Sequence, residues 1–201
     1  LTFLLSLTAS MSLLAADAEE GFISLMDGKT FNGWKKAVEN PNTWKVEGGA
    51  FVAAGPRCHL FLETAEPFKN FHLKAEVMTE PGSNGGIYFH TRYQANGWPS
   101  AGFECQVNNT HSDWIKTGSL YGLVNVGHAF GKDRQWWTQE IIVQGNTVTV
   151  RVDGTTVLQY TEPPGALPGG SFGRKIGEGT FALQGHDPKS VIRYRNIRVK
   201  R

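Results

Sequence analysis

Apolar and polar residues alternate with a period of two along most of the chain from Gly21 onward. In residues 71–78, FHLKAEVM, every second side chain is apolar, and the same pattern returns in residues 146–152, NTVTVRV. Successive side chains of a β-strand point to opposite faces, so this period is typical of half-buried antiparallel strands. The pattern therefore predicts strands rather than helices.

Two-residue turn signals separate these runs. Gly48-Gly49, Gly145-Asn146 and Asp153-Gly154 are pairs that suit tight hairpins. The stretch VTVRVDGTTVLQY is the strongest hairpin signal. Further strands are predicted over residues 22–26, 43–47, 50–54, 58–63, 136–144, 180–185 and 190–200. No stretch of ten or more residues has the 3.6-residue period of an amphipathic helix.

The chain of 201 residues is long enough for one domain with a substantial core and short for two. About a dozen strands without helices predict an all-β fold, a two-sheet antiparallel β-sandwich. Residues 93–101 and 108–120 are irregular. Residues 161–179 are rich in glycine and proline and are predicted to form a long loop.

The first residues, LTFLLSLTASMSLLAADAEE, are apolar and then turn acidic. The apolar run is too short and too rich in serine and threonine for a membrane span. Residues 1–18 are predicted to be a signal peptide, with cleavage after Ala16-Asp17-Ala18 or, alternatively, after Leu14-Ala15-Ala16. The competing interpretation is a buried N-terminal segment. A signal peptide predicts a secreted or periplasmic protein whose domain covers residues 21–201.

Charge and cysteine content narrow the function. The formal net charge is +2 and the basic residues are scattered, which argues against a nucleic-acid partner. Cys58 and Cys105 allow one disulfide in an oxidising compartment. However, Cys105 lies between Phe103 and Val107 on an apolar strand face, which favours a buried free thiol. No cysteine or histidine spacing typical of zinc sites occurs.

Three predicted strands carry an unusual polar face. They lie within GGIYFHTR (85–92), GFECQVNN (102–109) and FALQGH (181–186). Alternation assigns one face to the core: Ile87, Phe89, Thr91, Phe103, Cys105, Val107, Phe181 and Leu183. The opposite face receives Tyr88, His90, Arg92, Glu104, Gln106, Asn108, Gln184 and His186. A single Arg–Glu pair across an exposed sheet is common and contributes little. Three strands with the same design predict a polar groove.

The irregular segments add side chains that could border this groove. They are Trp98, His111, Asp113, Trp114 and Lys116. Aromatic rings that can stack on a sugar, beside amide and carboxylate groups, suit a neutral polyhydroxylated ligand. A phosphate ligand fits poorly, because no glycine-rich loop opens a helix here. These patterns predict a ligand class and do not identify a reaction.

Six motifs carry a family resemblance. They are GFISLMDGKTFNGW (21–34), NGGIYF (84–89), GFECQV (102–107), TGSLYGL (117–123), LQGH (183–186) and RYRNIRV (193–199). In this order they resemble the 3-keto-disaccharide hydrolase domain family, over essentially all of residues 21–201. The resemblance implies a concanavalin-like (lectin-like) jelly roll with a groove on its concave sheet. It also implies cleavage of 3-keto-glycosides, sugars already oxidised at the 3-position.

The family motifs carry over residue by residue. The matching positions are Asn84, Gly86, Glu104, Gln106, Gly118, Tyr121, Gln184 and His186. The sequence departs from the family pattern at Gly85, where serine is frequent, and at Cys105, where an aliphatic residue is usual. Gly185 stands where an acidic residue often precedes the histidine. This last departure would remove a polar partner of His186.

The resemblance implies net hydrolysis by elimination and hydration. A ketone at carbon 3 acidifies the hydrogen on carbon 2, so one general base, donors at the enolate oxygen and one general acid suffice. Glu104 or a histidine would be the base, Arg92 with Gln106 would hold the enolate oxygen, and His90 or His186 would be the acid. The expected substrate-binding residues are Gln106, Gln184, Tyr88, Tyr121, His111, Asp113, Lys116, Trp98 and Trp114.

Alternatives stay open at this level. Jelly rolls of this kind also serve as non-catalytic carbohydrate-binding, lectin-like modules, and a fold does not fix a function. A third option is an interaction domain of a larger secreted assembly. The chemistry requires no cofactor and the sequence has no fixed metal motif. A divalent metal is nevertheless left open, because Glu104, His111, Asp113 and His186 could supply ligands. The oligomeric state is not predicted.

Overall fold

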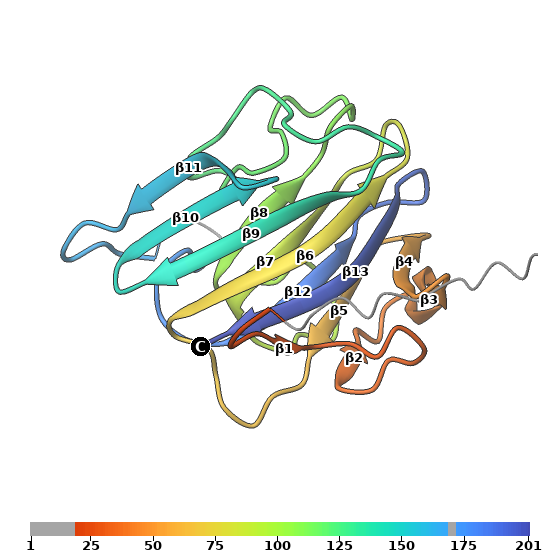
Figure 1. Ribbon diagram of the computed structural model, residues 1–201, viewed down its shortest axis with the longest axis horizontal. Helices are drawn as coiled ribbons and strands as arrows, with labels where there is room; N and C mark the ends of the chain where they lie inside the picture. The colour runs from red at the N-terminus through yellow and green to blue at the C-terminus, as the bar shows by residue number, and fades with distance from the viewer. Residues whose placement is uncertain (1–18, 169–171) are drawn as a thin grey trace, which may run out of the picture.

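Two antiparallel sheets make up the protein (Figure 1). The computed structural model describes residues 19–168 and 172–201, which form thirteen strands and one short 3-10 helix, η1 (Pro41–Thr43). The predicted all-β sandwich is confirmed. In these two ranges no helix has the length and apolar character needed to cross a membrane. The predicted signal peptide, residues 1–18, lies outside the described residues.

The larger sheet has eight strands in the order β11-β10-β9-β6-β13-β4-β3, with β1 paired to β13. Its members are β1 (Ile23–Ser24), β3 (Trp44–Glu47), β4 (Ala50–Ala54), β6 (Phe71–Thr79), β9 (Trp137–Gln144), β10 (Thr147–Val152), β11 (Thr155–Thr161) and β13 (Val191–Lys200). The smaller sheet has five strands in the order β2-β5-β12-β7-β8. Its members are β2 (Trp34–Lys36), β5 (Cys58–Leu62), β7 (Gly85–Thr91), β8 (Phe103–Val107) and β12 (Thr180–Gly185).

The predicted hairpins form where the turn signals stand. Gly48-Gly49 joins β3 to β4, Gly145-Asn146 joins β9 to β10, and Asp153-Gly154 joins β10 to β11. Gly48 and Gly49 have φ angles of 59° and 78°, the left-handed region that a type I′ turn requires at both positions. The three-residue strand β2 was not predicted, because Trp-Lys-Lys is too short to show alternation.

The core lies between the two sheets and contains the apolar halves of the strands. In β6, buried residues alternate strictly with partly exposed ones, as the sequence predicts. The core-facing residues expected from β7, β8 and β12 are all buried. Cys58 and Cys105 are free and buried, so the expectation of free thiols is confirmed. Burial raises the pKa of Cys58 to about 11 and that of Cys105 to about 12, so both remain protonated at neutral pH.

Candidate active site

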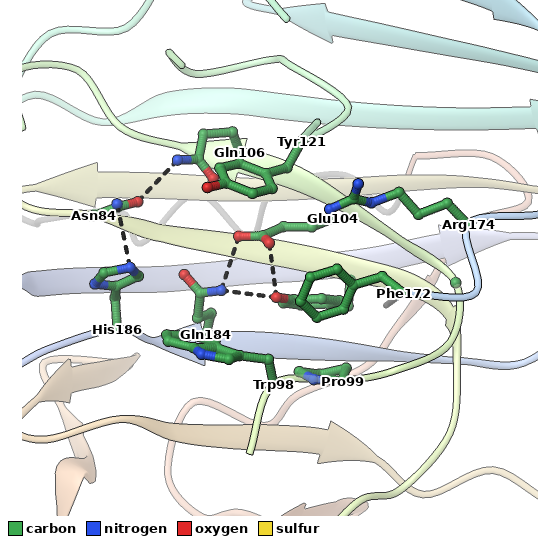
Figure 2. A pocket seen from close by; sticks show the side chains of 12 residues that line it. Asn84, Trp98, Pro99, Glu104, Gln106, Tyr121, Phe172, Arg174, Gln184 and His186 are labelled. Atoms are coloured by element: carbon green, nitrogen blue, oxygen red, sulfur yellow. Dashed lines mark hydrogen bonds between the residues drawn. The ribbon is translucent and has the colours of Figure 1, made fainter. Parts of the chain in front are cut away.

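A cavity of about 240 Å³ lies on the face of the five-stranded sheet that points away from the core. Its lining residues are Asn84, Tyr88, Trp98, Pro99, Gly102, Glu104, Gln106, Tyr121, Phe172, Arg174, Gln184 and His186. We call it the first cavity. Figure 2 shows Glu104 near its centre, with Trp98 and Pro99 on one side of it in this view and Tyr121 on the other. Seven of the predicted residues meet here: Tyr88, Trp98, Glu104, Gln106, Tyr121, Gln184 and His186.

Both carboxylate oxygens of Glu104 accept hydrogen bonds, one from a side chain of β7 and one from a side chain of β12. The Tyr88 hydroxyl donates to Oε2 at 2.8 Å, and the Gln184 amide donates to Oε1 at 2.8 Å. Burial raises the pKa of Glu104 to about 7, although the bonds from Tyr88 and Gln184 act in the opposite direction. A carboxyl group with this pKa exchanges protons readily near neutral pH, as a general base or acid must.

A chain of amides connects Glu104 with His186. Gln106 Nε2 donates to Asn84 Oδ1 at 3.0 Å, and Asn84 Nδ2 lies 3.4 Å from His186 Nε2. Exchanging oxygen and nitrogen in the Gln106 amide places its nitrogen 3.2 Å from Glu104 Oε1 and its oxygen 3.0 Å from Asn84 Oδ1, and the second contact becomes a hydrogen bond when the Asn84 amide is exchanged as well. The two amides can therefore run their hydrogen bonds in either direction between the carboxylate and the imidazole.

His186 has an acidic partner despite the glycine that precedes it. Asp187 Oδ2 lies 2.8 Å from His186 Nδ1, so the residue after the histidine supplies this contact. A β-carbon at Gly185 would lie 2.8 Å from Thr43 Cγ2, on the side away from the first cavity. Burial raises the pKa of Asp187, but hydrogen bonds from Ser190 and His186 bring it below its ordinary value. Asp187 is thus ionised and can orient the imidazole.

Trp98 forms an aromatic wall held by an ion pair. The centroids of the Trp98 and His186 rings are 5.2 Å apart, and the Arg57 guanidinium lies 4.8 Å from the centroid of the Trp98 ring. Arg57 makes two hydrogen bonds to Glu39, at 3.1 and 2.9 Å, and Glu39 also accepts the backbone N–H of Gly97 at 2.9 Å. These bonds fix the loop that carries Trp98.

Phe172 and Arg174 line the first cavity and were missed by the sequence analysis. Gly173, between them, exchanges backbone hydrogen bonds with Ser100 and Gly102, at 2.7 and 3.2 Å. The Arg174 guanidinium lies 5.7 Å from the Tyr121 ring centroid, and its charge lowers the pKa of Glu104. Both residues belong to the glycine-rich loop 161–179, where no periodic pattern indicates which side chains turn inward.

The expectation that His90 and Arg92 share this groove was wrong. Tyr88 pairs with Ala182 and Thr91 with Thr180, so β7 gains one residue relative to β12 and forms a β-bulge. His90, with a φ of 54°, occupies the bulge, and the alternation is lost beyond it. Arg92 lines a different cavity.

His90 is a structural residue. Its Nε2 donates to Lys69 O at 2.9 Å, and its Nδ1 accepts the backbone N–H of Gly177 at 3.3 Å. Its ring packs against Phe71 at 5.6 Å. Burial lowers the pKa of His90, so the neutral tautomer that these two bonds require is favoured.

Four residues of the loop after β8 were expected to bind substrate, and only some of them lie near the first cavity. The His111 ring lies 5.9 Å from that of His186, and the charge of Asp113 raises the pKa of Glu104. Lys116 instead donates to the carbonyl oxygens of His111 and Asp113, at 2.6 and 2.7 Å. Trp114 does not line the first cavity and is 61% exposed.

His59 is a buried neighbour of the site that the sequence analysis did not consider. It is fully buried, and neither ring nitrogen has a partner among the described residues. Its ring packs edge-on against Tyr88 at 5.4 Å and against Trp98 at 5.6 Å. Burial lowers the pKa of His59 to about 3, so the ring is neutral in the folded protein.

The four possible metal ligands, Glu104, His111, Asp113 and His186, do not form a ligand cluster. Across residues 19–168 and 172–201, no group of three or more histidine, cysteine, aspartate or glutamate side chains is arranged to hold a metal ion. The donors that surround Glu104 are instead a phenol and amides.

Comparisons with known proteins agree with this geometry. A family model described as a 3-keto-alpha-glucoside-1,2-lyase-like domain matches residues 21–200. A 3-keto-disaccharide hydrolase of Bacteroides thetaiotaomicron is 36% identical over 87 residues, which are 38% of this chain and 29% of that protein. The match thus spans less than a third of the length of this relative.

Solved structures share the fold. A protein of Parabacteroides distasonis, described as a proposed glycosyl hydrolase, has a TM-score of 0.73 and 20% identity, over 90% of this chain and 94% of that one. The carbohydrate binding module CBM66 from Bacillus subtilis has a TM-score of 0.61 and 12% identity, over 84% of this chain and 96% of that one. These similarities confirm the expected jelly-roll fold.

Proposed function

The chain belongs to the family of 3-keto-alpha-glucoside-1,2-lyase-like domains, and from this we propose that it cleaves glycosides whose sugar carries a ketone at carbon 3. The name of the Bacteroides relative supports a disaccharide as the substrate. The observation that carries the proposal is Glu104, a carboxyl group in a cavity with a pKa of about 7. A module that only binds sugar has no need of a carboxyl group adjusted in this way.

Glu104 is the proposed general base. In its ionised form it takes the hydrogen from carbon 2, and the electron pair of that C–H bond forms the enolate with the carbonyl at carbon 3. Tyr88 and Gln184 orient the carboxylate, and Oε2, which accepts the Tyr88 hydroxyl, keeps a lone pair for the proton. The ketone is essential, because it makes the hydrogen on carbon 2 acidic enough for a carboxylate to remove.

Arg174 is the proposed donor to the enolate oxygen, because Gln106 donates to Glu104 and to Gly85 O when the base is ionised. Arg174 takes the role first expected for Arg92, because it lines the first cavity and Arg92 does not. A fixed guanidinium beside the developing negative charge stabilises the transition state more than the ground state. The Phe172–Arg174 segment is held by backbone hydrogen bonds to Ser100 and Gly102, so this donor is pre-positioned.

His186 is the proposed general acid. As the C1–O bond breaks, the imidazolium donates its proton to the leaving glycosidic oxygen, and the sugar becomes an enone with a double bond between carbons 1 and 2. Asp187 orients the ring through Nδ1. Water then adds to the enone, with its proton going to carbon 2 and its hydroxyl to carbon 1, which completes a net hydrolysis.

The reversible amide chain suits this proton balance. Before the reaction, the imidazolium donates to Asn84, Asn84 donates to Gln106, and Gln106 donates to ionised Glu104. After the reaction, Glu104 carries a proton and His186 has lost one, and the opposite direction of the same bonds fits. Asn84 and Gln106 can therefore accommodate both protonation states of the base and the acid.

The direct test compares a 3-keto-glucoside with its unoxidised parent, each with and without a chelator. The 3-keto-glucoside should be cleaved and the unoxidised glucoside left intact. A rate that does not change when a chelator is added would support catalysis by the residues named above without a metal ion. Glu104→Gln should lower kcat by about 10²–10⁴-fold. Glu20→Gln, which changes an exposed carboxylate, is the matched control.

Deuterated water tests the enolate itself. Exchange at carbon 2, or a primary isotope effect there, is expected from proton removal by Glu104. Cleavage without either effect would contradict elimination. Binding of the ketone without turnover, with or without added divalent metal, would establish the alternative, a carbohydrate-binding module.

We also propose that the reaction takes place outside the cytoplasm. The apolar run of residues 1–18 supports this proposal. Expression of the full chain with an epitope at its C-terminus, followed by fractionation, tests it. A cytoplasmic protein that retains residues 1–18 would contradict it.

A further inference from the structure

A second cavity, of about 410 Å³, opens on the same sheet where β5 and β7 end and β12 begins. Its lining residues are Lys35, Phe61, Leu62, Glu63, Thr64, Pro67, Thr91, Arg92, Tyr93, Gly179 and Thr180. Phe61 and Tyr88 both pair with Ala182, which places the two cavities on one face of the sheet. The segment 92–102 contributes Tyr93 to the lining of this cavity and Trp98 to the lining of the first cavity.

The second cavity has two cations without acidic partners. Neither Lys35 nor Arg92 forms an ion pair with any described residue. The Lys35 ammonium lies 4.4 Å from the centroid of the Tyr93 ring, and the Tyr93 and Phe61 rings form a T-shaped pair with centroids 5.3 Å apart. The cation over this ring competes with stacking on a neutral sugar, and the two cations make charge the main recognition element here.

Polar groups accompany these cations. Thr91 is 2% exposed, and its hydroxyl oxygen has no partner among the described residues. This oxygen is closed off from solvent, so Thr91 forms part of the cavity wall. Thr180 donates to Leu62 O at 2.7 Å and keeps its lone pairs, and Glu63 adds a carboxylate that can accept from sugar hydroxyls.

We propose that the second cavity binds an acidic sugar, a hexuronate residue, at a place separate from the reaction at Glu104. Arg92 pairs with the sugar carboxylate through its planar fork, and Lys35 approaches the same group as a second cation. Glu63 and the Thr180 hydroxyl accept hydrogen bonds from the ring hydroxyls. That the ligand is a carbohydrate rests on the proposed function. The carboxylate follows from the charges of the cavity.

Nuclear magnetic resonance on the full domain can locate the binding. Methyl β-glucuronide should shift the amide signals of Thr91 and Tyr93 saturably at millimolar concentrations and leave the Trp98 indole signal in place. Methyl β-glucoside and acetate are the comparison ligands and should bind at least tenfold more weakly. Arg92→Ala should weaken glucuronide binding at least tenfold. Lys132→Ala, which removes an exposed lysine outside both cavities, should leave it unchanged.

Glu104→Gln separates this proposal from the catalytic one. That variant should lose turnover and keep full glucuronide binding. Absence of saturable shifts, or equal affinity for acetate, would overturn the acidic-sugar site. Shifts centred on Trp98, with binding lost in Arg174→Ala rather than Arg92→Ala, would also overturn it, because the ligand would then occupy the first cavity. Each of these results leaves the test of turnover on 3-keto-glucosides independent.

Discussion

The side chain of Glu104 occupies the space that a β-carbon at Gly86 would need. A β-carbon built at Gly86 would lie 2.5 Å from Glu104 Oε1 and 2.8 Å from its Cγ. Gly86 pairs with Gln106 in the ladder between β7 and β8, so the neighbouring Glu104 can lie across the backbone of β7. There its two oxygens reach Tyr88 and Gln184. The glycine therefore sets the position of the proposed base.

Gly86→Ala should abolish most of the activity and leave the fold intact. The new methyl group displaces the end of a flexible side chain, so the backbone has no reason to move. We expect kcat on a 3-keto-glucoside to fall about 10²-fold, because an oriented base accounts for a factor of this order. Thermal unfolding should change little. A large loss of stability with normal kcat in the folded fraction would contradict this role of Gly86.

The activity should rise with pH through the pKa of Glu104. The base acts when ionised, and the pKa of its carboxyl group is about 7, so kcat/KM should increase up to slightly above neutral pH. Tyr88→Phe removes a hydrogen bond that lowers this pKa and should move the rising limb to higher pH. A rising limb near pH 4.5, the ordinary value for glutamate, would show that another group is the base.

Asn84 should connect the protonation of Glu104 with that of His186. Asn84→Ala breaks the amide chain, and we expect kcat to fall about tenfold with KM nearly unchanged. The rising limb of the pH profile should also move to lower pH, because the Gln106 nitrogen loses Asn84 Oδ1 and can turn to Glu104 Oε1 and Gly85 O, each 3.2 Å away, which lowers the pKa of Glu104. Asn96→Ala, in an exposed loop, is the control. Loss confined to KM would mark Asn84 as a substrate-binding residue.

Asp187→Asn should reveal the general acid through the choice of leaving group. A poorly oriented imidazole protonates the glycosidic oxygen less well, which matters most when that oxygen is strongly basic. We expect a 3-keto alkyl glucoside to lose about 10-fold to 100-fold in kcat, and a 3-keto nitrophenyl glucoside to lose little. Equal losses for both substrates would exclude proton donation by His186.

The sequence predicts much of this site, because strand alternation is a local rule. Glu104 and Gln106, or Gln184 and His186, are separated by one residue and must share a face while the strand stays regular. The rule fails at His90 and Arg92, where β7 bulges. The bulge lies where a segment distant in sequence approaches closely, since a β-carbon at Gly179 would clash with Thr91 O. No local pattern encodes such an approach.

The sequence did not predict the site residues that lie in loops, because loops have no regular alternation. Arg174 is placed by backbone bonds between its loop and residues 100–102, and Asp187 by a turn beyond the end of β12. Neither position follows from a period. His59 lies in a strand that the sequence predicts, and alternation could have assigned it to the polar face. Its burial, however, depends on contact with Trp98, which belongs to a loop distant in the sequence.

His59 should make the protein sensitive to acid, and Glu104 should hide part of that effect. The folded protein keeps His59 neutral down to about pH 3, whereas the unfolded chain binds a proton below 6.5. The unfolded state thus holds more protons between these values, and the free energy of unfolding falls as the pH falls. The pKa of Glu104 is about 7 in the folded protein and 4.5 in the unfolded chain. Between these pH values the folded state holds more protons, so the free energy of unfolding falls as the pH rises.

His59→Phe should uncover this opposition between pH 4.5 and 6.5. Relative to the unsubstituted protein, the free energy of unfolding of the variant should fall with rising pH by up to about 1.4 kcal/mol per pH unit. At neutral pH the change should be small, because neither nitrogen of His59 loses a protein hydrogen bond. Urea unfolding across this range measures it, and Glu104→Gln should show the opposite slope. Parallel curves for His59→Phe and the unsubstituted protein would mean that His59 has the same pKa in the folded and unfolded states, which would contradict the effect of its burial.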